Sequence, residues 1–322
     1  MHAYSRCMSG ACCAPGDERH DDAADVALGS VPHGGGTPPD TFVDVPAATF
    51  RMGDDSVWAY PGDGEGPVHD VALDAFRIDR FAITNHAFSR FVDATDWTTD
   101  AERFGWSFVF GGLLPDDFPD TRAVVGTEWW RQVRGASWRR PEGPQSDLAG
   151  RDDHPVVQVS WRDAAAYCRW TGTRLPTEAE WERAARGGRA GTVFPWGDDL
   201  EPSGEHRMNV FQGSFPGRNT GADGFLGTAP VNAFPPNDLG LHNVTGNVWE
   251  WCADWFDVAA YEHHHAQNPR GPSRGERRAQ RGGSYLCHLS YCRRYRVSAR
   301  YGSEPESSTG NTGFRVAADP PP

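Results

Sequence analysis

Two cysteines near the C-terminal end of the chain, Cys287 and Cys292, have a spacing that no regular element explains. In a β-strand they would point to opposite faces and lie roughly 16 Å apart, at about 3.3 Å per residue. The backbone between them must therefore bend if the two thiols act together. A convergent thiol pair suits a disulfide, zinc or Cu(I) far better than calcium or magnesium. The spacing predicts a reactive or metal-binding loop.

Arginines are concentrated around this pair. Those within the same short stretch of sequence are Arg281, Arg293, Arg294, Arg296 and Arg300. Positive charge near a thiol favours the thiolate, which is the reactive and metal-binding form. We therefore expect these arginines to activate the two cysteines.

The cysteine count argues against a disulfide framework, because seven thiols are an odd number in a chain of 322 residues. Paired cysteines in a reducing compartment are more often catalytic or metal-binding than structural. The adjacent Cys12 and Cys13 are compatible with a redox switch or a metal site. No convergent ligands lie near them, so we interpret them, like Cys7, as incidental residues of a terminal tail.

Composition defines the broad class of protein. With 38% hydrophobic residues the chain can build a large core, and its net charge of −13 argues against a nucleic-acid partner. No run approaches the ~20 apolar residues of a membrane span, and the N-terminal region lacks the ~7–15-residue apolar core of a signal peptide. We expect a soluble protein with no membrane partner that is not exported by that route.

The pattern of elements predicts one domain behind a tail. Residues 1–40 are rich in Gly, Asp, His and Pro and are predicted to be disordered, and residues 41–322 to form a single domain. Short strands are expected at 49–52 and 71–78. Residues 96–150 carry few periodic signals and many Gly, Pro and Trp, so we expect a loop-rich segment that walls a groove.

Three helix starts are signalled by capping residues. Thr84 precedes an apolar face, and Ser160 opens a second helix with Gly172 as its stop. Thr177 begins a capping box, and Gly187 closes that helix. We therefore expect three helices in the middle of the chain.

Oxygen donors are dense in the turns beyond residue 194. With backbone carbonyls, Asn209, Asp223, Asn243 and Glu250 would supply the about six to eight oxygens of a calcium site. Ordinary turn chemistry explains the same residues and is favoured by spacing alone. The histidines at 263–265 are interpreted as an exposed run rather than a metal cluster.

A series of motifs runs along the chain from about Val45 to Asp319. They are Arg174-Leu-Pro-Thr-Glu-Ala-Glu-Trp-Glu182, Phe194-Pro-Trp-Gly197, Phe215-Pro, Asn219-Thr-Gly-Ala-Asp-Gly-Phe225, Gly227-Thr-Ala-Pro-Val231, Gly246-Asn-Val-Trp-Glu-Trp251, Arg281-Gly-Gly-Ser-Tyr-Leu-Cys-His-Leu-Ser-Tyr-Cys-Arg-Arg-Tyr-Arg296 and Gly313-Phe-Arg-Val-Ala-Ala318. Together they strongly resemble formylglycine-generating enzymes, the sulfatase-modifying factors. The helix and Gly-Asn-x-Trp-Glu-Trp motifs also occur in a wider superfamily, so the context of the two cysteines specifies the activity.

The resemblance implies a fold and a reaction. The fold is α+β, a variant of the C-type-lectin-like fold with mixed short strands, few helices and many loops. The implied enzyme is a copper-dependent oxidase in which Cys287 and Cys292 hold Cu(I). Its substrate is a cysteine in an unfolded sulfatase segment of the type Cys-x-Pro-x-Arg. Using O2, the enzyme removes a hydrogen from the substrate Cβ, and the thioaldehyde that results is hydrolysed to formylglycine.

The resemblance also assigns residues to the site. Ser284 joins the two cysteines as a catalytic residue, and substrate-binding roles fall to Trp138, Trp249, Tyr291 and His288. In the family Trp138 matches an aromatic wall of the peptide groove, although a Trp in this chain is as readily a core residue. Two calcium sites are implied, partly through backbone carbonyls: the first at Asn209, Val210, Asp223 and Phe225, and the second at Asn243, Gly246, Val248 and Glu250.

Departures from the family pattern bear on location and specificity. Secretory relatives pair a cysteine matching Cys168 with one at the position of Val316, and a second pair maps to Ala185 and Val297. Those disulfides are impossible here, so the resemblance implies a cytoplasmic enzyme of bacterial type, which we expect to be a monomer. An acidic residue that receives the substrate arginine in some relatives is replaced by Trp106.

Three alternatives remain at this point. A lectin-like binding module would keep the fold without needing both cysteines. An iron enzyme related to sulfoxide synthases requires a His-x3-His-x-Glu run, which the sequence lacks. A thiol-disulfide oxidoreductase usually carries Cys-x-x-Cys at a helix start.

Overall fold

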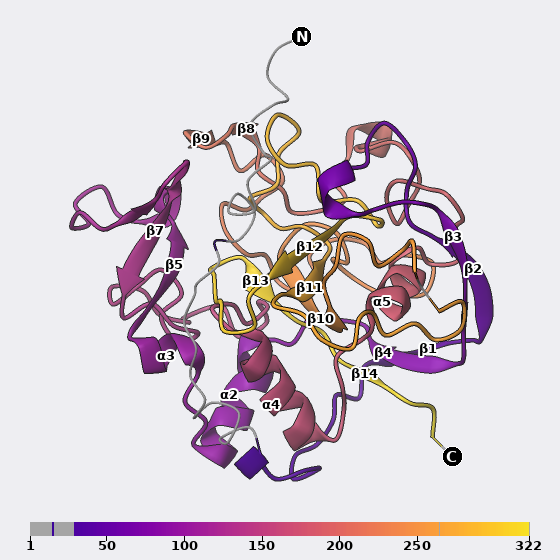
Figure 1. Ribbon diagram of the computed structural model, residues 1–322. Coiled ribbons are helices and arrows are strands. Elements are labelled where there is room, and N and C mark those ends of the chain that lie inside the picture. Colours follow the sequence, from indigo (N-terminus) through magenta and orange to yellow (C-terminus); the bar gives the residue numbers. More distant parts are fainter. Residues whose placement is uncertain (1–14, 16–28, 264, 322) are drawn as a thin grey trace.

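The computed structural model describes residues 15, 29–263 and 265–321 and shows a chain with short elements and long connections (Figure 1). The helices are α2 (Asn85–Thr95), α3 (Asp100–Phe104), α4 (Trp161–Thr171) and α5 (Glu178–Ala185), with 3-10 turns η1 (Pro61–Asp63), η2 (Gly111–Leu113) and η3 (Pro202–Gly204). The strands are β1 (Phe42–Val45), β2 (Ala48–Met52), β3 (His69–Leu73), β4 (Phe76–Asp79), β5 (Trp106–Phe110), β6 (Ala123–Val124), β7 (Thr127–Arg134), β8 (Gly213–Ser214), β9 (Arg218–Asn219), β10 (Trp249–Trp255), β11 (Arg278–Arg281), β12 (Arg300–Ser303), β13 (Thr312–Gly313) and β14 (Ala317–Ala318). Within this described part, no helix has the length and apolar character needed to cross a membrane.

The predicted helix starts are confirmed. Thr84 accepts a hydrogen bond from the backbone of Ala87 at the start of α2. Ser160 and Thr177 each form a capping box, in which a carboxylate three residues later accepts a hydrogen bond from the backbone N–H of the cap residue. Gly172 ends α4 in the left-handed conformation. Local side-chain chemistry therefore sets where these helices begin.

A four-stranded sheet in the order β12-β11-β10-β13 lies at the centre of the molecule, with α5 on one side of it (Figure 1). β11 is antiparallel to both β10 and β12, and β13 runs parallel to β10. The strands predicted near 49–52 and 71–78 are confirmed as β2, β3 and β4; β2 pairs with β3, and β4 with β1 and β14. The connection between β11 and β12 carries both cysteines of interest, so the central sheet fixes its two ends.

The segment at 96–150 is more regular than the sequence indicated. It contains α3 and a three-stranded sheet in the order β5-β7-β6. The eight residues of β7 mix buried, partly buried and exposed positions without strict alternation. The cluster to which this sheet contributes consists mostly of aromatic side chains, among them Phe108, Phe110 and Trp130.

The predicted tail boundary at residue 40 is too late in the chain. Val31 is buried in a core cluster, and its carbonyl accepts a hydrogen bond of 2.6 Å from Arg169 Nε on α4. The backbone of Gly34 and of Gly36 donates to the last turn of α4. Packed structure therefore begins by residue 31. The tail predictions for Cys7, Cys12 and Cys13 lie outside the described residues.

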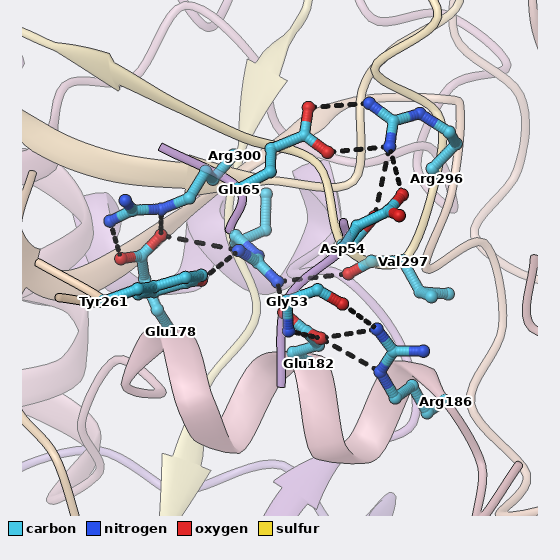
Figure 2. Close-up of polar contacts among 12 residues, drawn as sticks. Gly53, Asp54, Glu65, Glu178, Glu182, Arg186, Tyr261, Arg296, Val297 and Arg300 are labelled. Carbon is cyan, nitrogen blue, oxygen red and sulfur yellow. Dashed lines mark hydrogen bonds and ion pairs between the residues drawn. The ribbon is translucent and has the colours of Figure 1, made fainter. Parts of the chain in front are cut away.

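Buried ion pairs tie the C-terminal third of the chain to α5 and to the β2–β3 connection (Figure 2). Glu182 on α5 binds Arg281 and Arg186, and Glu178 binds Arg300. Arg296 binds Glu65 at 2.6 Å. Because a buried charge is strongly unfavourable unless paired, each of these arginines depends on its carboxylate.

Candidate functional site

A tight turn brings the two cysteines together, as their spacing required. The backbone N–H of His288 donates to the carbonyl of Cys292 at 3.1 Å, and that of Cys292 returns a bond of 2.8 Å. The two sulfur atoms, Cys287 Sγ and Cys292 Sγ, then lie 3.4 Å apart, and both side chains are buried. This separation exceeds the about 2.05 Å of a disulfide, so the thiols are adjacent and unbonded.

Two glycines allow the chain to enter this turn. Gly282 and Gly283 both have positive φ, 96° and 71°. A Cβ on Gly283 would lie 2.7 Å from the carbonyl oxygen of Arg294. Only glycine suits this position, because the backbone is left-handed and packs against the backbone of the segment at Arg294.

Hydrogen-bond donors face both sulfur atoms. The backbone N–H of Ser284 lies 3.4 Å from Cys287 Sγ, and Arg294 Nη1 lies 3.7 Å from Cys292 Sγ. Ser284 Oγ accepts bonds from Asn311 Nδ2 at 2.9 Å and from the backbone of Leu286 at 3.3 Å. A hydroxyl that accepts two bonds still has its own proton to donate. The structure thus places Ser284 beside the thiols, as the sequence predicted.

Aromatic side chains surround the pair. Trp249 is fully buried in the same cluster as both cysteines, and its Nε1–H has no hydrogen-bond partner among the described residues. Buried N–H groups are nearly always paired. A donor of this kind in the cluster that contains the thiols is a feature that a bound ligand would satisfy.

Tyr291 lies on the partly exposed side of the site. Its ring stacks on Phe215 with 4.3 Å between centroids, and Trp129 meets it edge-on at 4.9 Å. All three side chains are partly buried, so they offer an aromatic surface next to Cys292. Neither Trp129 nor Phe215 was predicted as a site residue, although Phe215-Pro is one of the family-like motifs.

The structure places Trp138 elsewhere. Its ring has no exposed surface and packs on Phe88 of α2, 5.2 Å between centroids, in a core cluster that contains neither cysteine. A ring with no exposed surface does not line a groove. The prediction of Trp138 as a groove wall is therefore wrong for this structure, and the core alternative holds.

His288 lies at the start of the turn and is partly buried. Burial lowers the pKa of its imidazole, and its Nδ1 pairs with Ser290 Oγ at 2.8 Å. With Leu289, which is 49% exposed, it borders a cavity of about 100 Å³. His288 is thus available at the surface beside the cysteines.

Most arginines in the cluster around the thiols are paired with carboxylates. Arg281, Arg296 and Arg300 are matched by buried carboxylates, as described above. Arg293 lies over the ring of Trp58, 4.7 Å from its centroid. Ion pairing offsets the charge of these arginines locally, and the expectation that they activate the cysteines as a group stays a prediction. Arg294 contacts Cys292 Sγ directly, at 3.7 Å.

The residues predicted for a first calcium site are brought together. Asp223 Oδ2 accepts a bond of 2.9 Å from the backbone of Val210, and its Oδ1 accepts one of 3.2 Å from that of Phe225. Asn209 lies next to Val210, with its Nδ2 bound to the Gly227 carbonyl. Burial raises the pKa of Asp223, so its charge would gain from a cation. A carboxylate beside backbone carbonyls is the type of ligand that calcium takes.

The residues predicted for a second calcium site fit less well. Asn243 Oδ1 is buried and lacks a partner in the described part of the chain. Glu250, the single carboxylate of the set, is bound by both Arg315 and the indole N–H of Trp181. Since its charge is already matched, little remains to hold a dication. Gly246 and Val248 are buried in the same region.

The remaining described cysteines are expected to be unreactive, because burial disfavours their thiolate forms. Cys168 and Cys252 are free and buried. Burial raises the pKa of Cys168 to about 12 and that of Cys252 well above its ordinary value. Among the described thiols, the adjacent pair is therefore the one whose geometry suits a soft metal ion such as Cu(I).

The chain matches the family model described as "Sulfatase-modifying factor enzyme 1-like domain" over residues 30–320. It is 56% identical over 283 residues to the formylglycine-generating enzyme of Thermomonospora curvata, covering 87% of this chain and 93% of that one. It is 52% identical over 298 residues to the enzyme of the same name from Bos taurus, covering 91% and 78%. A Bos taurus relative named "Inactive C-alpha-formylglycine-generating enzyme 2" is 44% identical over 282 residues, covering 86% and 87%.

Among solved structures, PvdO from Pseudomonas aeruginosa aligns with a TM-score of 0.59 at 27% identity, covering 87% of this chain and 94% of that one. The few helices, short mixed strands and long loops are those of the variant C-type-lectin-like fold that the sequence predicted. Since relatives with this fold include a protein named inactive, the fold alone does not specify chemistry.

Proposed function

Because the chain belongs to the family of sulfatase-modifying factor enzyme 1-like domains, we propose that it is a formylglycine-generating enzyme, which oxidises a sulfatase cysteine to Cα-formylglycine. The observation that carries the proposal is the pair of buried thiols 3.4 Å apart. The names of relatives that are 56% and 52% identical to the chain support the same activity. The substrate would be an unfolded sulfatase segment of the type Cys-x-Pro-x-Arg.

Cys287 and Cys292 would hold Cu(I). Two soft thiolates suit this soft monovalent ion, and a substrate thiol would be a further soft ligand of the same kind. When bound, copper would supply the redox chemistry by which O2 oxidises the substrate cysteine.

The remaining residues of the site would bind and orient. Ser284, whose backbone N–H faces Cys287 Sγ, would present its hydroxyl proton to the substrate. Trp249 would present an N–H that has no partner among the described residues. The surface formed by Tyr291, Phe215 and Trp129 would receive apolar parts of an extended peptide. The buried aromatic cluster would also exclude water, which strengthens each of these polar contacts.

A structural calcium at Asn209, Val210, Asp223 and Phe225 is part of the proposal. The pairing of Glu250 with Arg315 weighs against the second site, so we propose the first alone. Its role would be to fix the Asn209 loop, whose neighbour Phe211 donates a backbone bond of 3.0 Å to the carbonyl of Cys287.

The activity is tested by incubating the purified chain with Cu(I), O2, a thiol reductant and a Cys-x-Pro-x-Arg peptide, followed by mass spectrometry of the peptide. We expect the mass loss of thiol-to-aldehyde conversion and an aldehyde that reacts with a hydrazide probe. Copper bound to the chain without any such conversion would sink the proposal.

The thiol pair is tested by Cys287→Ser and Cys292→Ser. Each change removes one of two soft ligands, so we expect both variants to lose tight Cu(I) binding and peptide conversion. Cys168→Ala is the matched control, because it removes a thiol that lies in another core cluster. Stoichiometric, tight Cu(I) binding by both serine variants would refute the two-thiol site.

A further inference from the structure

A buried ion pair beside the site, Arg294 with Asp63, has no role in the mechanism above. Arg294 Nε donates to Asp63 Oδ2 at 2.5 Å, and its Nη2 donates to Oδ1 at 3.1 Å. The third nitrogen, Nη1, lies 3.7 Å from Cys292 Sγ. Arg294 is 3% exposed, Asp63 8% and Cys292 1%. Every nitrogen of the guanidinium thus has a defined partner, and one of these is a sulfur of the reactive pair.

The backbone around Asp63 holds the carboxylate in place. Asp63 ends η1, and the preceding Tyr60 accepts a bond of 3.0 Å at its hydroxyl from the backbone of Arg293. Two residues beyond Asp63, Glu65 binds Arg296. The turn therefore contacts the segment after Cys292 at three successive points, and Asp63 has little freedom to leave Arg294.

The charge of the metal site gives the Asp63–Arg294 pair a role. Two thiolates and one Cu(I) carry one net negative charge, and a substrate thiolate adds another. A buried anionic centre of this kind is unfavourable without a nearby donor or cation. Because Asp63 offsets the guanidinium charge on its far side, the effect of Arg294 is local: a fixed N–H aimed at one sulfur. Charge-assisted hydrogen bonds of this type are stronger than neutral ones.

We infer that Asp63 and Arg294 are positioning residues of the copper site. Asp63 fixes the guanidinium plane, and Arg294 holds Cys292 Sγ facing Cys287 and stabilises the anionic sulfur–metal centre. The inference rests on the proposed function for the identity of the metal; the contacts themselves are independent of it.

The first test is the Cu(I) affinity of the full chain, measured without substrate by competition with a Cu(I)-specific chelator. We expect Arg294→Gln to weaken binding about tenfold or more, which corresponds to about 1.4 kcal/mol. Arg294→Lys keeps the charge but loses the two-nitrogen fork to Asp63, so its affinity should lie between those of the wild type and Arg294→Gln. In peptide assays, Arg294→Gln should raise KM more than it lowers kcat, because the substrate thiolate adds negative charge.

Arg293→Gln is the matched control, since it removes the same charge from the adjacent residue, whose guanidinium lies over Trp58. Its Cu(I) affinity should equal that of the wild type. The double variant Asp63→Asn/Arg294→Gln leaves neither partner of the pair as an unmatched buried charge, so we expect it to fold, as circular dichroism would verify. Wild-type Cu(I) affinity and KM in this double variant would overturn the inference.

Different results would contradict the proposed activity and the inferred role of Asp63 and Arg294. A wild-type chain that converts the peptide but binds no Cu(I) would remove the inference and leave the activity standing. A chain that binds Cu(I) through Arg294-dependent contacts but converts no peptide would retain the inference and remove the proposed function.

Discussion

At the scale of single residues, the site combines buried side chains with partly exposed ones. Cys287 and Cys292 are buried and face one another, whereas Tyr291 and His288 on the same turn are partly exposed. The buried members suit metal binding, and the exposed members suit contact with a peptide. Ser284 lies at the inner end of the turn, where its hydroxyl reaches Asn311.

Ser284→Ala tests whether that hydroxyl takes part in turnover. A hydrogen bond to a charged group contributes about 1.5–3 kcal/mol, so we expect kcat to fall roughly 10–100-fold. Cu(I) affinity should change little, because the backbone N–H of Ser284 still faces Cys287 Sγ. Steady-state kinetics and chelator competition measure the two effects.

Ser273→Ala serves as the control for this change. Ser273 is exposed and lies in the connection between β10 and β11, outside the cysteine turn, and we expect near wild-type kcat. Equal kcat in Ser284→Ala and the wild type would remove Ser284 from the mechanism.

At the scale of elements, the cysteine turn is a long connection between two paired strands. β11 and β12 hold its ends in register, Arg281 opposite Arg300. Both arginines are anchored to α5 through Glu182 and Glu178 (Figure 2). The helix therefore positions the turn although it contributes no residue to the site.

Gly283→Ala tests how strictly the turn is held. A non-glycine residue at φ 71° is strained by roughly 1–3 kcal/mol, and the new methyl group would press on the Arg294 carbonyl. We expect a lower melting temperature and weaker Cu(I) binding, measured by calorimetry and chelator competition.

Gly62→Ala is the control within η1, where a Cβ meets no atom within 4 Å. It should leave both quantities near their wild-type values. If Gly283→Ala matched Gly62→Ala in Cu(I) affinity, the turn would be more adaptable than its packing indicates.

At the scale of the whole molecule, stability depends on carboxyl groups buried far from the site. Asp100 and Asp163 meet where α3 approaches α4, and Asp163 is fully buried. Burial, followed by repulsion from Asp100, raises the pKa of Asp163 to about 8. Burial also raises the pKa of Asp100.

The expected pH dependence follows from the sign of this shift. The pKa of Asp163 in the folded chain lies above its unfolded value of about 4. The contribution of the pair to stability is therefore complete below about pH 4 and is lost as the pH rises through about 8. Melting temperatures between pH 5 and 9 should fall less steeply for Asp100→Asn than for the wild type. The exposed-site variant Asp93→Asn should keep the wild-type slope, and parallel curves for all three would contradict the assignment.

The sequence by itself determined the local features of this protein. Thr84, Ser160 and Thr177 specify helix starts because a cap bonds within its own first turn. The spacing of Cys287 and Cys292 required a bend because strand geometry would separate them. The family-like motifs predicted the fold through their resemblance to known enzymes, because motifs in the same order along the chain indicate the same arrangement of elements.

Only the tertiary structure decided which distant residues meet. Asp63 and Arg294 are 231 positions apart, and no periodic or capping signal links them. Trp138 and Trp129 have similar local sequence, yet one is in the core and the other lies against Tyr291. Most arginines near the cysteines pair with buried carboxylates that α5 and the β2–β3 connection contribute, and nothing in the sequence near them indicated those partners. Pairings of this kind depend on how the packed elements are arranged in space, and the linear order of residues does not contain that arrangement explicitly.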